Sequence, residues 1–225
     1  MRIAPFSEIL DAVQARHGAE GLAPRLPTPK TAEELRATQD DRYLSDMERR
    51  IFRAGLKHSL VDAKWPAFEE AFFGFEPRRI RAMPDDELEK LLGDARLIRH
   101  WGKLKSVRDN AAALLDVAAE NGGSFGAWLA AWPGGDIVGL WEALAKRFSQ
   151  MGGNSGPSFL RMVGKDTFVL TPAVIAALQR WGVVDAPPKN RQDRARVQEA
   201  FNTWAGESGR PLCHVSLILA ASVDA

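Results

Sequence analysis

The chain has 225 residues, of which 45% are hydrophobic and 26% charged, a balance that is ordinary for a globular protein and excludes wholesale disorder. Its formal net charge of +1 provides no general attraction to polyanions, so a nucleic-acid surface has to be a local basic patch. The one cysteine, Cys213, excludes a disulfide framework and a cysteine-rich zinc site, and we expect neither a metal nor another cofactor.

At this length the chain can form one sizeable core or two small lobes that share a groove. No apolar stretch approaches the roughly 20 residues that a membrane span requires, and the first residues lack the apolar core of a signal peptide. We therefore expect a cytoplasmic protein that does not bind membranes.

In the first part of the chain, apolar residues recur at helical spacing. Residues 5–18 fit a short amphipathic helix capped by Ser7, and the three prolines of residues 21–30 indicate a loop or an extended connector. We therefore treat residues 1–30 as a separate N-terminal segment. Thr31 is followed three residues later by Glu34, the capping-box pattern that begins a helix.

Prolines divide the middle of the chain into shorter helices. Residues 57–73 are predicted to form two helical pieces, broken or offset at Pro66, because proline cannot donate a backbone hydrogen bond. The pairs Glu76-Pro77 and Met83-Pro84 each begin a short helix. The next segment, residues 96–108, contains five Lys or Arg and no acidic residue, and it precedes predicted helices over residues 106–121 and 125–132.

The most informative stretch is MGGNSGPSFLRMVGK, residues 151–165. A helix predicted over about residues 136–148 ends in the turn Gly152-Gly153-Asn154-Ser155-Gly156, and Pro157 begins the next helix. Such a hairpin presents free backbone N–H groups at a helix N-terminus, an arrangement that binds phosphate. The alternative is an ordinary corner between two helices, since glycine-rich connections are common.

Three more helices follow the hairpin. Thr171-Pro172 provides an N-cap and a first helical residue for a helix that ends at Gly182. The last two are predicted over about residues 191–205 and 211–222. No strand pair and no internal repeat is evident, so the predicted fold class is all-α.

Two segments upstream of the hairpin resemble the DNA-3-methyladenine glycosylase I family. They are FRAGLKHSLVDAKWPAFEEAFFGFEP, residues 52–77, and DARLIRHWGKLKSVRDNA, residues 94–111. The hairpin and the following GKDTFVLTPAVIAAL are similar to the helix-hairpin-helix DNA glycosylase superfamily. The resemblance covers roughly residues 43–184 and implies a domain over residues 31–225 with two lobes and a central cleft that receives a flipped base.

The function that this resemblance implies is that of a monofunctional DNA glycosylase of base excision repair. Its partner is double-stranded DNA with a damaged base, from which it removes an alkylated base such as 3-methyladenine. A positively charged alkylated purine is already a good leaving group, so its removal requires a tight pocket and water more than strong acid catalysis. We expect the protein to act as a monomer.

Three positions depart from the family pattern. The Glu that recognises the base in the family corresponds to Arg50, and the Trp of its AGLSW-type segment corresponds to His58. Many members of the superfamily carry a catalytic Asp where this chain has Thr171, although the 3-methyladenine branch works without that Asp. These departures leave two alternatives open: a DNA-binding protein that has lost catalysis, and a glycosylase for a different modified base.

The candidate site residues follow from the resemblance and from the hairpin. Glu48 and Asp46 are the acids nearest to the lost family Glu, and we nominate them as catalytic groups; a solvated helix face is the alternative for Glu48. The nominated base-pocket residues are Tyr43, Phe52, His58, Trp65 and Trp101, and plain core packing is the alternative for each aromatic side chain. The nominated contacts to the DNA backbone are Gly153, Asn154, Ser155, Gly156, Arg161, Lys165, Arg99 and Lys103.

Overall fold

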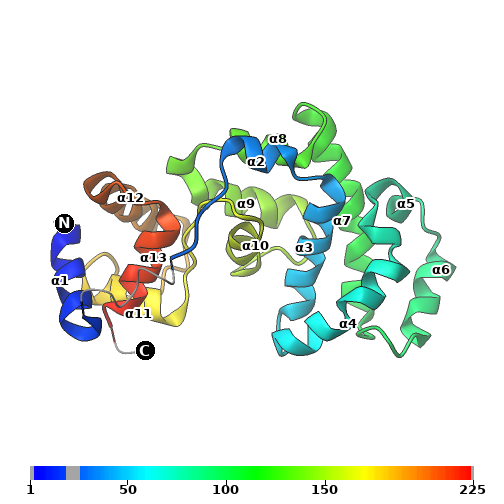
Figure 1. Cartoon of the computed structure of the whole chain (residues 1–225), viewed down its shortest axis with the longest axis horizontal. Helices are drawn as coiled ribbons and strands as arrows, with labels where there is room; N and C mark the ends of the chain where they lie inside the picture. Colours follow the sequence, from blue (N-terminus) through cyan, green and yellow to red (C-terminus); the bar gives the residue numbers. More distant parts are fainter. Residues whose placement is uncertain (1–2, 19–25, 224–225) are drawn as a thin grey trace. The chain divides into compact units, whose positions relative to one another are not determined.

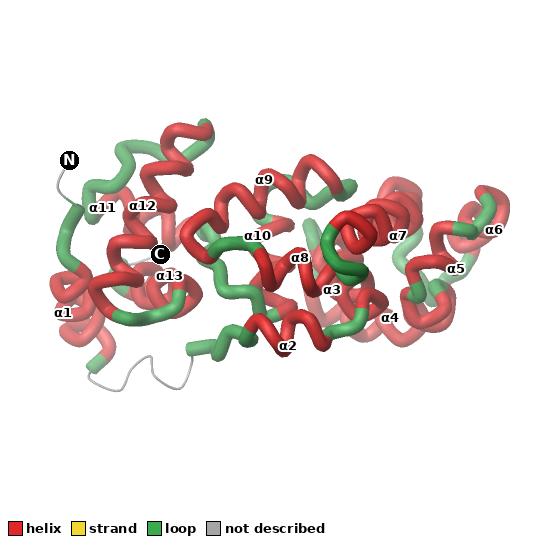
Figure 2. Tube along the Cα trace, turned by 90° about the horizontal axis from the view of Figure 1, so that it is seen from above, coloured by secondary structure: helices red, strands yellow, loops and turns green. Residues whose placement is uncertain are grey.

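The computed structural model describes residues 3–18 and 26–223 of the chain. Within these ranges every regular element is a helix, which confirms the predicted all-α class (Figures 1 and 2). The α-helices are α1 Phe6–His17, α2 Ala32–Ala37, α3 Asp40–Arg53, α4 His58–Ala71, α5 Pro77–Arg81, α6 Asp85–Lys90, α7 Trp101–Glu120, α8 Phe125–Ala131, α9 Ile137–Arg147, α10 Ser155–Val163, α11 Pro172–Arg180, α12 Arg191–Ser208 and α13 Leu212–Ala221.

The helices form two compact units. The terminal unit comprises residues 1–29, 133–140 and 166–225, and the central unit comprises residues 30–132 and 141–165. In the predicted N-terminal segment, residues 3–18 and 26–29 belong to the terminal unit, where α1 packs against α12 and α13, and Lys30 belongs to the central unit. Residues 21–25 of the predicted proline-containing connector lie outside the described residues.

Helix α4 is continuous through Pro66, so the predicted break is wrong. Val61, Trp65 and Phe68 are buried on both sides of the proline. Trp65 stacks on Phe68 and Phe75, with ring centroids 5.0 and 5.4 Å apart. Packing of these side chains on the core offsets the one backbone hydrogen bond that proline cannot form.

Helix α7 begins at Trp101, five residues before the predicted start at Ser106. His100 caps it, because the Nδ1 atom accepts a hydrogen bond of 3.3 Å from the backbone N–H of Lys103. Part of the basic segment therefore lies on the first turns of a helix and not in a loop before it.

The turn between α9 and α10 is placed slightly earlier than predicted. Helix α10 begins at Ser155 after the N-cap residue Asn154, so Ser155 and Gly156 belong to the helix and the predicted start at Pro157 is wrong. Gly156 is buried, and a Cβ atom there would lie 3.1 Å from the carbonyl oxygen of Met151. This close approach explains a glycine inside the first helical turn.

Local capping signals are confirmed at two helices and wrong at a third. At α2, the Thr31 hydroxyl accepts from Glu34 N and the Glu34 carboxylate accepts from Thr31 N, at 3.2 and 2.7 Å. At α11, the Thr171 hydroxyl accepts from Val174 N at 3.2 Å. Helix α1 instead begins at Phe6 after the N-cap residue Pro5, so Ser7 lies inside its first turn.

Candidate functional site

Helix α3 of the central unit carries both nominated acids, and Glu48 is fully buried. Its Oε1 atom accepts a hydrogen bond of 2.7 Å from Asn110 Nδ2, and its Oε2 atom lies 3.3 Å from Ser106 Oγ. Burial raises the pKa of Glu48 to about 8, although the hydrogen bond from Asn110 opposes the shift. The alternative of a solvated helix face is therefore wrong for Glu48, and its carboxyl group is largely protonated at neutral pH.

Asp46 has a different environment on the same helix. It is half-buried, and no side chain in the described ranges donates a hydrogen bond to its carboxylate. Burial raises the pKa of Asp46, and the positive charges of Arg49 and Lys30 oppose the shift. Asp46 is thus a carboxylate whose oxygens have no hydrogen-bond donor within the described protein.

Arg50, at the position of the family Glu, lies among other cations. Its Nε atom is buried and has no hydrogen-bond partner in the described part of the chain. Burial lowers the pKa of Arg50, and so does the charge of Arg53, which forms its own ion pair with Asp62 at 2.6 Å. Burial and the charge of Arg50 in turn lower the pKa of Lys103. A positive charge therefore stands at the position that the sequence resemblance aligns with the family Glu.

The nominated aromatic residues do not form one group. Phe52 and Trp65 lie in the same cluster, with ring centroids 6.3 Å apart, and Trp65 Nε1 donates to Ser45 Oγ at 3.0 Å. Tyr43 packs against Phe125 instead, and its hydroxyl donates to the Leu35 carbonyl at 2.7 Å. All three are buried, as core packing requires, so a role in a base pocket stays a prediction for them.

Trp101 is an exposed apolar side chain. Leu56, Leu60 and Trp101 are the exposed large hydrophobic residues within the described ranges, and His58 is exposed between the two leucines. Lys103 Nζ donates to the Ala54 carbonyl at 2.8 Å, which holds the first turn of α7 beside the loop that carries Leu56. The exposed side chains of Leu60 and Trp101 come from two helices of the central unit, α4 and α7.

The nominated backbone contacts separate into exposed and buried residues. Gly153, Asn154 and Arg99 are exposed, whereas Ser155 and Arg161 are partly buried. Lys165 Nζ donates to the Trp132 carbonyl at 2.9 Å, and both this lysine and Lys103 are nearly buried. These two ammonium groups already have carbonyl partners, so their contact with DNA stays a prediction with weaker geometric support than that of the exposed residues.

The loop before α10 is held against α7 by side chains that the sequence analysis missed. Asn110 Oδ1 accepts from Ser149 N at 2.7 Å, and Asn110 Nδ2 donates to the Ser149 carbonyl at 3.2 Å. Gln150 Nε2 donates to the Gly102 carbonyl at 2.8 Å. The sequence does contain an indication of these contacts. Ser106 and Asn110, four residues apart, place polar groups on the apolar face of a helix, where they need hydrogen-bond partners.

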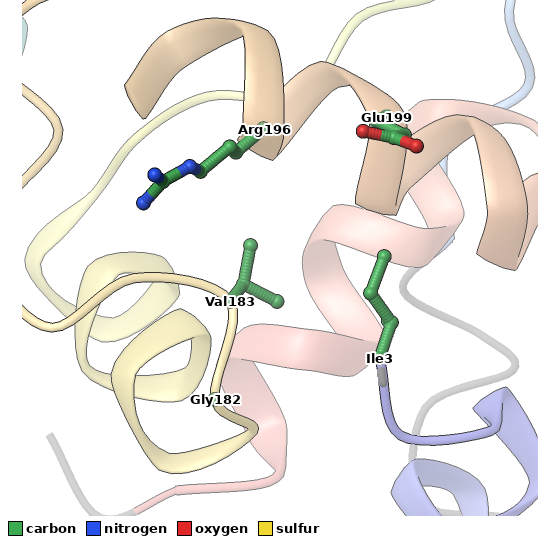
Figure 3. Close-up of a pocket in the computed structure, with 5 residues that line it drawn as sticks. All are labelled: Ile3, Gly182, Val183, Arg196 and Glu199. Carbon is green, nitrogen blue, oxygen red and sulfur yellow. The ribbon is translucent and has the colours of Figure 1, made fainter. Parts of the chain in front are cut away.

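A separate pocket of about 370 Å³ lies in the terminal unit (Figure 3). Arg196 and Glu199 line the pocket from α12, and Ile3, Gly182 and Val183 complete the lining. None of the nominated site residues lines this pocket. The described residues also contain no group of three metal-ligating side chains, and no described helix is long and apolar enough to cross a membrane.

Comparison of the sequence with known proteins gives two matches. The sequence model of a family described as methyladenine glycosylase matches residues 36–186. DNA-3-methyladenine glycosylase 1 of Escherichia coli (strain K12) is 36% identical over 73 residues. Those residues are 32% of this chain and 38% of the Escherichia coli protein, so the match spans well under half of the length of that protein.

Comparison of the structures gives matches of low sequence identity. A variant of 3-methyladenine DNA glycosylase I from Staphylococcus aureus is 22% identical, with a TM-score of 0.51 over 56% of this chain and 77% of that one. The 8-oxoguanine glycosylase/lyase of Methanocaldococcus jannaschii, in complex with DNA, is 13% identical, with a TM-score of 0.54 over 95% of this chain and 94% of that one. These likenesses confirm the expected glycosylase-like fold.

Proposed function

The chain belongs to the methyladenine glycosylase family, and from this membership we propose that it is a monofunctional DNA glycosylase of base excision repair. It hydrolyses the N-glycosidic bond of an alkylated base such as 3-methyladenine after the base has left the duplex, and an abasic site remains. The observation that carries the proposal is the family match over residues 36–186, which includes α3, α7 and the hairpin formed by α9 and α10. Its DNA substrate is proposed on the same ground.

Asp46 is the acid that we assign to the reaction. A carboxylate at the edge of a site can stabilise the positive charge that develops on the sugar, or orient the attacking water, only if its oxygens are not already bonded. Asp46 meets this condition, whereas both oxygens of Glu48 contact buried side chains. Thr171 supplies no carboxylate, so the proposed reaction relies on the alkylated base being a good leaving group.

The exposed part of the hairpin, together with Arg99 and Trp101, supplies the contacts to DNA. Gly152, Gly153 and Asn154 are exposed directly before α10, and the N-terminus of a helix is a position that favours a phosphate group. Arg99 adds a positive charge immediately before α7. Trp101, exposed on the first turn of α7, provides a ring on which a base can stack.

No lysine stands where a bifunctional relative would carry its nucleophile. Ser158 and Phe159 occupy that part of α10, and neither can form a Schiff base with the sugar. Borohydride treatment of the protein with damaged DNA should therefore trap no covalent complex. A trapped complex would contradict the monofunctional mechanism.

The test is release of free 3-methyladenine from methylated duplex DNA. We expect release by the wild-type protein, a strong loss in Asp46→Asn, and no loss in the matched control Asp86→Asn, which alters an exposed ion pair with Lys90. Absence of release at protein concentrations that saturate the DNA would contradict the proposed function. It would favour a DNA-binding protein without catalysis.

A glycosylase for a different modified base is the second candidate, and Arg50 favours it. The Arg50 guanidinium lies close enough to Lys103 and Arg53 for their charges to interact, and no described carboxylate pairs with it. A cationic base such as 3-methyladenine would be repelled by this cluster, whereas a neutral base with carbonyl oxygens would not. Release of other modified bases in the same assay, without release of 3-methyladenine, would establish this candidate.

A further inference from the structure

The buried carboxyl group of Glu48 lies between α3 and α7, on the inner side of the loop that leads to α10. We infer that Glu48, as a neutral acid, is a positioning residue that holds this loop in place through Asn110. The loop, residues 148–154, contains the exposed glycines of the proposed phosphate grip, so the consequence for DNA binding rests on the proposed function. The positioning itself rests on the hydrogen bonds alone.

The hydrogen bonds of Asn110 account for every polar atom of its side chain. Asn110 Nδ2 donates one hydrogen bond to Glu48 Oε1, with an N–O distance of 2.7 Å, and a second to the Ser149 carbonyl oxygen, with an N–O distance of 3.2 Å. The Oδ1 atom accepts from Ser149 N at 2.7 Å. Ser149 thereby fixes which way the amide faces, since a flipped amide would point N–H at N–H. Glu48 Oε1 must consequently act as an acceptor.

The second oxygen of Glu48 faces the Ser106 hydroxyl, which carries one hydrogen. The hydroxyl oxygen lies 2.7 Å from the Lys103 carbonyl and 3.3 Å from Glu48 Oε2. The shorter contact takes the hydroxyl hydrogen, because a carbonyl can only accept. The contact with Oε2 is then a hydrogen bond only if Glu48 supplies the hydrogen. Both contacts are satisfied when the acid is neutral.

The surroundings of Glu48 agree with a neutral acid. The side chain is fully buried, and burial is the main cause that raises its pKa to about 8. The charged neighbour that adds to this shift is Asp109 on α7, and its negative charge also disfavours ionisation. No basic group opposes the shift, so an ionised Glu48 would be a buried charge without a counter-ion.

The loop contains a strained backbone conformation, and hydrogen bonds to α7 stabilise it. Gln150 is a non-glycine residue with a φ of 59°, in the left-handed region, and its side chain donates to the Gly102 carbonyl. Ser149, directly before it, is held at both its N–H and its C=O by Asn110. When the loop opens, water reaches Glu48 and the carboxyl group ionises at its ordinary pKa, so opening becomes easier as the pH rises towards the higher pKa of the closed state.

The experiment measures amide hydrogen exchange across residues 149–154 in the wild type, Glu48→Gln and Glu48→Ala, at pH 7 and pH 9, without DNA. Glutamine has the shape of the neutral acid and can donate to Ser106 while it accepts from Asn110. We expect unchanged protection in Glu48→Gln at both pH values. We expect the wild type to lose about tenfold protection between pH 7 and pH 9, after correction for intrinsic exchange, since pH 7 lies about one unit below the pKa and the effect levels off above it. In Glu48→Ala protection should be lost at both.

Amides of α13 in the terminal unit serve as the internal reference, because they should not respond to either substitution. Equal pH dependence in the wild type and Glu48→Gln would overturn the inference. Where Glu48→Ala does not fold, the comparison of wild type with Glu48→Gln decides alone. Because no DNA is present, a protein without glycosylase activity can still pass this test, and an active glycosylase can fail it.

Discussion

Asn110 Nδ2 on α7 donates a 2.7 Å hydrogen bond to Glu48 Oε1 on α3, and both side chains are fully buried. The same amide holds Ser149, so one side chain joins two helices to the loop before α10. Polar groups in a core are stabilising only when each of them has a partner, and here the partners come from three separate segments. Removal of one member should therefore affect all three segments.

Asn110→Ala should lower the free energy of unfolding by on the order of 2 kcal/mol, because it leaves the buried Glu48 carboxyl and Ser149 N–H without partners. Urea unfolding at pH 7 measures the change. The matched control is Asn121→Ala at the other end of α7, whose side chain donates to the Val117 carbonyl in a less buried place. We expect a smaller loss for the control. Equal losses would contradict a central role of Asn110.

The stability of the wild type should depend on pH through Glu48. Its pKa is about 8 in the folded protein against 4.5 for an unperturbed glutamate, so between these values the folded protein binds one proton more than the unfolded chain. The free energy of unfolding therefore decreases as the pH rises from about 4.5 to about 8 and then levels off. Glu48→Gln removes this component. When the melting temperatures of the wild type and of Glu48→Gln are plotted against pH, from measurements at pH 5, 7 and 9, the two curves should converge or cross. Parallel curves would contradict the assignment.

Gly152→Ala should weaken DNA binding by about two- to fivefold, which corresponds to the ~0.3–1 kcal/mol that a helix N-terminus contributes to anion binding. Gly152 is exposed, and a Cβ atom there meets no atom within 4 Å, so the substitution keeps the fold while it obstructs a phosphate. Gly93→Ala has the same open surroundings and is the control. The loss should be equal for DNA of different sequences; a loss confined to one sequence would argue against a backbone contact.

Arg99→Ala should reduce the salt dependence of DNA binding. Each phosphate contact that is lost lowers the slope of log affinity against log salt by about 0.9. Fluorescence anisotropy at several salt concentrations measures this slope. Arg191→Ala, which removes another exposed arginine at the start of α12, should leave the slope unchanged. The same slope change in both variants would assign the effect to net charge and not to a contact.

Thr171→Ala should lower the free energy of unfolding by about 1 kcal/mol, because it removes the N-cap of α11. Thr171→Asp keeps an acceptor for Val174 N and should be close to wild type in stability. Both variants should retain base release when folded, since the proposed reaction makes no use of this position. Activity lost from a folded Thr171→Ala would show that the threonine contributes to catalysis.

Short-range features of the fold were predictable from the sequence. The capping box of Thr31 and Glu34 and the cap at Thr171 involve residues three positions apart, so both partners are visible in a short segment. The helices on either side of the hairpin were likewise predictable, because helical periodicity is a local property. The family resemblance placed these pieces in order and implied the glycosylase-like fold.

The positions of side chains in the core depended on tertiary contacts. Pro66 remains inside a helix because distant residues pack on both sides of it, and Lys165 uses its ammonium group on the Trp132 carbonyl, 33 residues away in the chain. Glu48 stands beside arginines in the sequence and resembles a solvated residue. Its neutral, buried state follows from Asn110, which lies 62 residues further along. Sequence determined the helices, whereas the packing of α3 on α7 decided which acid is buried and which remains available, because desolvation depends on neighbours in space.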